Sequence, residues 1–223
     1  MKEKKIKKSE QTRNHIYEGA IRIFSENGFE KTTIRALAKE LNISLGNLYY
    51  HFKSKDDILI HYFKILQQET SSAVSETLKS NKSMKVKVQA VIDENLKLLK
   101  KNKSITRDLI NSTSNLSHPL SPFGLELQAC QKEAIELFKQ ALTDHSKPGE
   151  YLDSIAFLYW FYYLGICLCW ANDSSAGAKN TQKLFDVTFP LTLKLISVTK
   201  LGVGKKLIIN VSVLLKKILI KWD

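Results

Sequence analysis

The chain has 223 residues, of which 43% are hydrophobic and 25% are charged, and its formal net charge at neutral pH is +12. This composition is ordinary for a globular protein, and only nine glycines and four prolines favour helices with few tight turns. Three cysteines exclude a disulfide framework, and the N-terminal lysines precede no apolar run of the kind found in a signal peptide. A cytoplasmic location is therefore expected.

The positive charge is concentrated at the two ends of the chain. Residues 1–64 contain 13 Lys and Arg against 8 Asp and Glu, and residues 200–223 contain 6 against 1, while the middle is nearly balanced. Basic ends predict an anionic partner, either nucleic acid or a lipid surface. A lysine-rich composition that only aids solubility is the alternative.

The first sixty residues have the pattern of three short helices. Apolar residues recur at helical spacing over residues 10–27, and Gly28 supplies the stop. Thr33 is a good N-cap for a second helix, and Ser44 is one for a third. Between these helices Asn42 tolerates the left-handed conformation that a tight turn requires.

A long fourth helix is expected to begin at Ser54, because Ser54 and Asp57 have the spacing of a capping box. A long helix followed by two short helices around a tight turn is the pattern of a helix-turn-helix. Leu48 and Phe52 lie four residues apart and should point inward together. Tyr49 and Tyr50 then fall partly outward, as do other groups suited to phosphates, sugars and base edges.

The remainder of the chain also has helical periodicity. Further helices are expected near 83–101, 104–114, 123–144, 150–172 and 178–199, and a basic amphipathic segment follows from residue 205. Ile155–Ala171 has no charge or amide, but its aromatic residues run through the centre and not at the two ends of a membrane span. A helix apolar on all sides is instead buried on all sides. The fold class predicted is all-α.

Catalytic and metal-binding motifs are missing from the sequence. The five histidines include no metal-spaced pair, and no G-x-S-x-G or phosphate-binding glycine loop is present. We therefore expect no catalytic residues, no metal site and no cofactor, and we do not expect an enzyme.

Residues 33–59, TIRALAKELNISLGNLYYHFKSKDDIL, resemble the DNA-binding signature of the tetracycline-repressor (TetR) family. The specific part is the run S-x-G-x-L-Y-Y-H-F-x-S-K, and the resemblance covers about a quarter of the chain. It implies an N-terminal helix-turn-helix domain followed by a larger helical domain for ligand binding and dimerisation. Family members are typically dimeric regulators, mostly repressors, released from an inverted-repeat operator by a small ligand.

Carried over by position, the resemblance assigns DNA contacts to a set of residues on the second and third helices and just beyond. They are Thr33, Ser44, Leu45, Gly46, Asn47, Tyr49, Tyr50, His51 and Lys55. Leu45 and Asn47 occupy positions that set base choice, and an apolar Leu45 predicts contact with a thymine methyl group. Packing for Tyr49 and a role as helix C-terminal cation for His51 are the alternatives.

The resemblance also implies a ligand pocket and a dimer interface. Candidate pocket residues are Tyr159, Phe161, Tyr162 and Tyr163, with a largely apolar ligand as the expectation. Packing in the core is the alternative for these aromatic residues. Candidate interface residues are Phe157, Trp160, Leu164, Leu168, Phe185, Phe189 and Leu193.

Three regions are therefore expected: a DNA-binding domain with a basic arm at 1–60, a ligand-binding and dimerisation domain at 61–200, and a basic amphipathic helix at 201–223. In the last region a stripe including Leu207, Leu214 and Trp222 could pack across a dimer or lie on an anionic membrane surface. The predicted function is a dimeric TetR-type repressor whose partners are operator DNA, a second copy and a small effector. A membrane-surface helical binding protein is the alternative.

Overall fold

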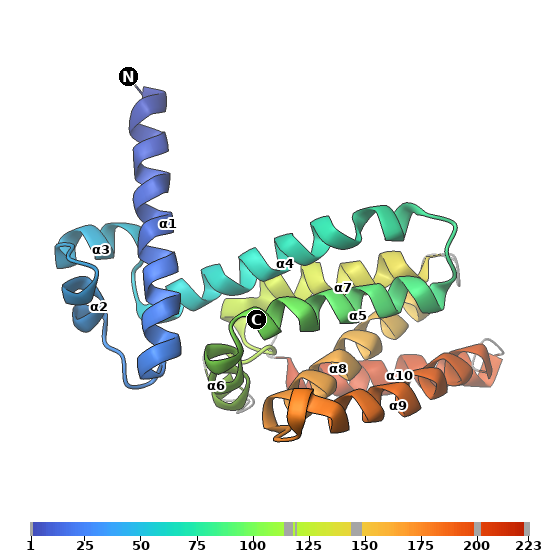
Figure 1. The fold of residues 1–223 in the computed structure, drawn as a ribbon. Helices are drawn as coiled ribbons and strands as arrows, with labels where there is room; N and C mark the ends of the chain where they lie inside the picture. The colour runs from blue at the N-terminus through green and yellow to red at the C-terminus, as the bar shows by residue number, and fades with distance from the viewer. Residues whose placement is uncertain (1, 114–117, 119, 144–148, 199–201, 221–223) are drawn as a thin grey trace.

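The computed structural model describes residues 2–113, 118, 120–143, 149–198 and 202–220, and every regular element within them is a helix. In chain order the helices are α1 (Lys2–Asn27), α2 (Ile34–Glu40), α3 (Leu45–His51), α4 (Lys55–Lys79), α5 (Met84–Lys101), α6 (Lys103–Thr113), α7 (Gln128–Leu142), α8 (Glu150–Asn172), α9 (Lys179–Val198) and α10 (Gly202–Leu219), with single 3-10 turns at Leu125–Leu127 and Ala176–Ala178. Figure 1 shows α1–α3 as a small unit at one end of a larger helical bundle. The predicted all-α architecture is confirmed.

Local capping explains where α4 begins. The Ser54 hydroxyl accepts a hydrogen bond from the Asp57 amide at 3.1 Å, and the Asp57 carboxylate accepts one from the Lys53 amide at 3.1 Å. The first bond is the N-cap half of a capping box and satisfies a donor that the first turn leaves free. The second bond uses the amide of Lys53, one residue before the N-cap, so the capping box predicted from the sequence is confirmed only in its Ser54 half.

The helices enclose two main hydrophobic clusters. The first, which we call the N-terminal core, joins buried residues of α1–α3 such as Phe24, Leu37 and Phe52 to the first turns of α4. The second lies in the larger bundle and includes Val74 near the far end of α4. One unbroken helix therefore contributes to both clusters, and the expected domain boundary at residue 60 falls inside it.

Helix α8 is the central element of the larger bundle. It is long and apolar enough to span a membrane, yet it packs against α6, α7, α9 and α10, which together cover much of its surface. At its C-terminal end the Asp173 carboxylate accepts hydrogen bonds from Ser175 and Thr181, and these bonds lower the pKa of that carboxyl. The turn from α8 into α9 is fixed in this way.

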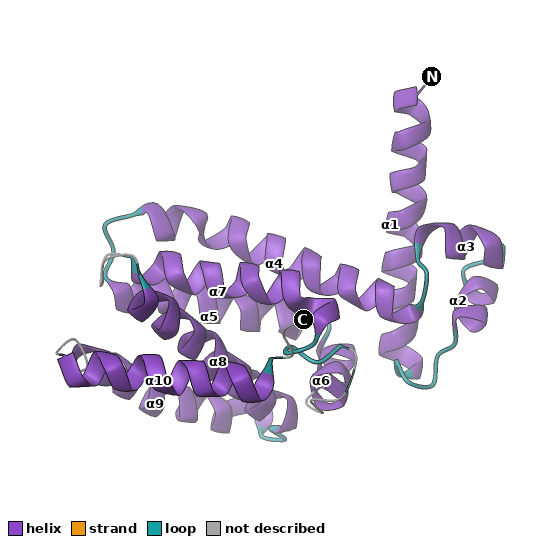
Figure 2. Cartoon of the chain, turned by 180° about the vertical axis from the view of Figure 1, so that it is seen from behind, coloured by secondary structure: helices purple, strands orange, loops and turns teal. Residues whose placement is uncertain are grey.

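The C-terminal helix belongs to the same bundle. Figure 2 shows α10 running along α8, and its inward residues are Ile208, Ile209, Leu215 and Leu219. Of the stripe predicted to pack across a dimer or lie on a membrane surface, Leu207 and Leu214 are exposed, and Trp222 lies outside the described residues. That prediction is not tested by a single chain.

The basic N-terminal arm continues α1, which begins at Lys2. Figure 1 shows this end of α1 projecting away from the rest of the molecule. In the C-terminal half, α9 continues as one helix through Pro190.

Candidate nucleic-acid interface and ligand pocket

The second and third helices form the turn that the sequence predicts. The Thr33 hydroxyl accepts a hydrogen bond from the Ala36 amide and the Ser44 hydroxyl accepts one from the Asn47 amide, both at 3.1 Å. Between them Asn42 has a φ of 52°, in the left-handed region. Thr33 and Ser44 are exposed at the N-termini of α2 and α3, where amide groups and the helix dipole favour an anion such as a phosphate.

Helix α3 buries one side and exposes the other. Leu48 and Phe52 are fully buried in the N-terminal core, as predicted, whereas Tyr50 is 78% exposed and Tyr49 is 46% exposed. A Cβ atom added at Gly46 would meet no other atom within 4 Å. The packing of this chain therefore gives no reason for glycine at that position, and close approach to an outside surface supplies one.

The side chain of His51 is half-buried beside α1, with its ring edge-on to Tyr50 at 5.0 Å. Burial lowers the pKa of His51, and the positive charge of Arg13 lowers it further. A neutral imidazole is therefore favoured at neutral pH, which argues against the helix-terminal cation as its main role.

Lys55, a predicted contact to the DNA backbone, makes several bonds within the chain. Its ammonium group donates to the carbonyl oxygens of Phe29 at 3.1 Å and Glu30 at 3.4 Å, and it lies 4.2 Å from the centroid of the Phe29 ring. The Lys55 side chain thus ties the start of α4 to the loop after α1. A direct contact between Lys55 and DNA would have to compete with these bonds.

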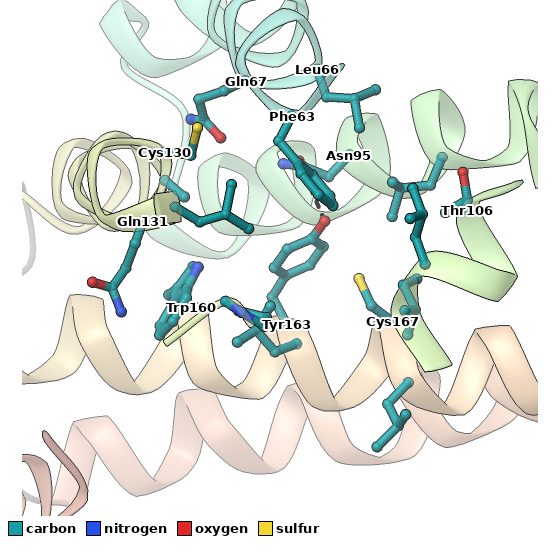
Figure 3. Close-up of a pocket in the computed structure, with 18 of the residues that line it drawn as sticks. Phe63, Leu66, Gln67, Asn95, Thr106, Cys130, Gln131, Trp160, Tyr163 and Cys167 are labelled. Atoms are coloured by element: carbon teal, nitrogen blue, oxygen red, sulfur yellow. Dashed lines mark hydrogen bonds between the residues drawn. The ribbon is translucent and has the colours of Figure 1, made fainter. Parts of the chain in front are cut away.

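The larger domain contains a cavity of about 310 Å³ between α4, α5, α6, α7 and α8 (Figure 3). Two of the four predicted pocket residues, Phe161 and Tyr163, line it. The other two do not: Tyr159 stacks on Phe138 in the core, and the Tyr162 hydroxyl is hydrogen-bonded to Thr188 of α9 at 2.8 Å. Side chains on one helix point in different directions, so aromatic density alone did not locate the pocket.

The cavity wall is mostly apolar and carries no Asp, Glu, Lys, Arg or His among the described residues that line it. Its polar groups were missed in the sequence, where Gln67, Gln131, Asn95 and Thr106 have no distinguishing pattern. Leu109 and Leu120 line the cavity and also belong to the N-terminal core. Thr106 lines the cavity too, and its hydroxyl is hydrogen-bonded to Tyr62, another residue of that core.

The predicted interface residues divide into two groups. Phe157, Trp160, Phe185 and Phe189 lie inside the core of this chain and are each less than 5% exposed, so a partner would meet little of them. Leu164 and Leu193 are partly buried and Leu168 is exposed. On α9 the exposed apolar residues are instead Leu184, Val187, Leu191 and Leu195, which recur at helical spacing.

The two parts of the chain match known protein families, and several relatives match it as well. Residues 16–62 match the family described as bacterial regulatory proteins, tetR family, and residues 87–210 match the tetracyclin repressor-like C-terminal domain. The fatty acid metabolism regulator protein of Bacillus subtilis (strain 168) is 30% identical over 137 residues, which are 60% of this chain and 68% of the relative. A second relative, the negative transcriptional regulator IcaR of the biofilm operon icaADBC in Staphylococcus aureus (strain Newman), is 46% identical over 46 residues, or 21% of this chain and 25% of IcaR.

Solved structures share the fold. Thermus thermophilus FadR, a TetR family transcriptional repressor in complex with lauroyl-CoA, aligns with a TM-score of 0.59 at 18% identity, over 85% of this chain and 95% of that one. The TetR family regulator PfmR, also from Thermus thermophilus, aligns with a TM-score of 0.55 at 19% identity, over 81% of this chain and 95% of that one. The matched families consist of transcriptional regulators and not of enzymes. The helix-turn-helix, the larger helical domain and these matches show that the chain belongs to the TetR family.

Proposed function

We propose that this protein is a dimeric repressor that binds an inverted-repeat operator and is released from it by a ligand with a fatty-acyl chain. The observation that carries the proposal is the apolar cavity whose end wall is also part of the N-terminal core. A ligand in that cavity would contact residues that pack against α1 and the start of α4. We expect the repressor to act in the cytoplasm, where the chromosomal DNA lies.

The chemistry of the cavity supports an acyl ligand. Its volume of about 310 Å³ is at the lower end of small-molecule sites, and its walls are lined mainly by Leu, Phe, Ile and Trp side chains. Burial of an alkyl chain against such walls is favourable by about 0.8 kcal/mol per CH₂ group. The Bacillus subtilis relative regulates fatty acid metabolism by name, and the Thermus FadR structure holds lauroyl-CoA, which agrees with this ligand class.

The DNA contacts are proposed for the exposed residues of α2, α3 and their caps. Tyr49, Tyr50, Gly46 and Asn47 present two hydroxyls, an open backbone and an amide on one short helix. Leu45 is partly buried against the N-terminal core, so only its outer methyl groups would reach a thymine.

Dimerisation is proposed through the exposed apolar stripe of α9, Leu184, Val187, Leu191 and Leu195. These side chains are between 40% and 65% exposed, and they lie on a helix that already packs against α8. An apolar stripe of this kind is typical of a surface that meets a partner. Two recognition helices in such a dimer read half-sites about 34–36 Å apart, or a multiple of that spacing.

The test is a selection of random duplex DNA by the purified protein at two salt concentrations, followed by titration of lauroyl-CoA onto the selected duplex. We expect an enriched inverted repeat that survives the higher salt and is released by lauroyl-CoA but not by free coenzyme A. Binding without sequence preference that falls steeply with salt, as phosphate-only contacts do, would contradict the proposal.

The membrane-surface alternative rests on α10, where Val203, Leu207, Leu214 and Ile218 are exposed among lysines. Two of those lysines turn toward the bundle, because Lys205 lies over the Tyr151 ring and Lys216 over the Phe157 ring, at 5.5 and 5.0 Å. Cation–π contacts of this kind use charges that a lipid surface would need. The structure therefore favours the DNA-binding function over this one.

A further inference from the structure

Two buried amide groups on the wall of the cavity have no partner within the described part of the protein. The Nε2 atoms of Gln67 on α4 and Gln131 on α7 make no hydrogen bond there, and the two residues are only 8% and 5% exposed. Both line the cavity, and Figure 3 shows their side chains on two different helices. A buried donor without an acceptor is costly, so such groups usually have a role.

Several other polar groups of the cavity wall have partners within the chain. The Tyr163 hydroxyl donates to Asn95 Oδ1 at 3.4 Å, and the Asn95 amide nitrogen donates to the Val91 carbonyl at 2.8 Å. The Thr106 and Tyr62 hydroxyls bond each other at 3.0 Å. The two glutamines are thus the donors that remain for a ligand among these groups.

The absence of charge along the described wall decides what kind of acceptor they take. A carboxylate or phosphate would lose its water there and meet no cation among the residues that line the cavity. A carbonyl oxygen costs far less to bury and matches an N–H donor.

We infer that Gln67 or Gln131 donates a hydrogen bond to the uncharged carbonyl of an acyl ester or thioester at the α4–α7 wall, so that the pocket selects esterified acyl chains over free fatty acids. The alkyl chain then lies toward α6 and α8, against side chains such as Leu109, Phe161 and Leu164. This inference deepens the proposed function and rests on it. A simple ester and a coenzyme A thioester present the same carbonyl, and the two differ only in what lies beyond it.

The experiment measures binding to the full-length protein without DNA, by calorimetry. The probes are methyl decanoate, decanoyl-CoA, sodium decanoate and 1-chlorodecane, which lacks the carbonyl. The variants are Gln67→Met and Gln131→Met, which keep the side-chain length but remove the donor, and the matched control is Gln68→Met, the exposed neighbour on the same helix.

We expect the wild-type protein to bind methyl decanoate at least tenfold more tightly than decanoate. At least one of the two pocket variants should weaken binding of both carbonyl probes by about three- to tenfold, the effect of one hydrogen bond, and leave 1-chlorodecane unchanged. Gln68→Met should change nothing. If decanoyl-CoA binds more tightly than methyl decanoate, the natural ligand is a coenzyme A thioester. If the two affinities are equal, the natural ligand is a simple ester.

Unchanged binding of methyl decanoate to both pocket variants would overturn the inference, and so would a preference of the wild type for decanoate. The ester-to-acid preference needs no variant, so the inference stays testable if a variant does not fold. If ester binding depends on the glutamines but no operator sequence is found, the proposed function is contradicted and the inference is not. If acyl compounds release the protein from an operator but the glutamine variants bind esters normally, the inference is contradicted and the proposed function is not.

Discussion

Tyr62 of α4 and Thr106 of α6 share a buried hydrogen bond, 3.0 Å long, at the place where the ligand cavity meets the N-terminal core. Nearby the Ser104 hydroxyl donates to the Ser25 carbonyl of α1 at 3.2 Å, so α6 is bonded to α4 on one side and to α1 on the other. A ligand that moves α6 therefore has a direct mechanical connection to the DNA-binding helices.

Thr106→Val should separate ligand binding from DNA release. Valine keeps the shape of threonine but removes one hydrogen-bond partner of the buried Tyr62 hydroxyl, which costs about 0.5–1.5 kcal/mol of stability. We expect lauroyl-CoA to bind with little change while the concentration needed to release operator DNA rises several-fold, measured by fluorescence anisotropy of labelled duplex. The control is Thr70→Val, because the Thr70 hydroxyl bonds within its own helix to Leu66. Equal release curves for Thr106→Val and wild type would remove this bond from the coupling.

Tyr50→Ala should weaken operator binding strongly without harming the fold. The side chain is 78% exposed, and its one described ring contact is with His51. We expect at least a tenfold loss of affinity for the operator and a melting temperature close to that of wild type. A folded variant with full affinity would show that α3 presents another face to DNA.

Lys55→Ala should destabilise the fold, in contrast to Tyr50→Ala, which should weaken DNA binding and leave the fold intact. The ammonium group bonds two backbone carbonyls and lies over the Phe29 ring, so its loss weakens the fold before it affects any phosphate contact. We expect a loss of about 1–2 kcal/mol in the free energy of unfolding, measured with urea. Unchanged stability with reduced DNA affinity would instead assign Lys55 to the DNA backbone.

Acidification should destabilise the protein through His61. Burial lowers the pKa of His61, with smaller contributions from Arg13 and Lys64 that outweigh Asp57, and the ring lies 5.1 Å from that of Tyr17. Because the folded state disfavours the proton, the unfolded state binds more protons below about pH 6.5, and stability falls as pH drops through that value. Urea unfolding at pH 7.5 and 5.5 should show this loss, and His61→Gln should reduce it. His51 has a pKa lowered in the same direction, so His51→Gln is the companion variant.

Leu191→Glu with Leu195→Glu should convert the dimer to a monomer, because both side chains are more than half exposed on α9 and carboxylates there would be buried between two copies. The measurement is light scattering after size-exclusion chromatography. The matched control is Leu214→Glu on α10, which should remain dimeric. If Leu214→Glu dissociates the protein and the α9 variant does not, the interface lies on α10.

The DNA-binding domain could be predicted from the sequence because its signals are local. Thr33, Ser44 and Ser54 cap helices by bonding the amide three residues later, and the turn at Asn42 depends on the conformation of that residue alone. Each of these features can therefore be predicted from a few neighbouring residues.

The larger domain was less predictable, since its features depend on contacts between distant helices. Phe157 and Trp160 belong to a helix that is apolar on most sides, and the sequence does not say whether a partner or the same chain covers them. Gln67 and Gln131 have the appearance of surface residues until α4 and α7 are placed together.

The shared core also limits how the gene could be recombined. Ile105, Leu109 and Leu120 lie beyond the first four helices in the sequence, yet they fill the same cluster as Ile16 and Phe24. A hybrid regulator that joins residues 1–60 of this protein to the effector domain of a relative would replace those three contacts with foreign ones. Exchange of DNA specificity between relatives should therefore succeed by grafting the outward residues of α3 alone, and fail when the whole N-terminal unit is transplanted without α6.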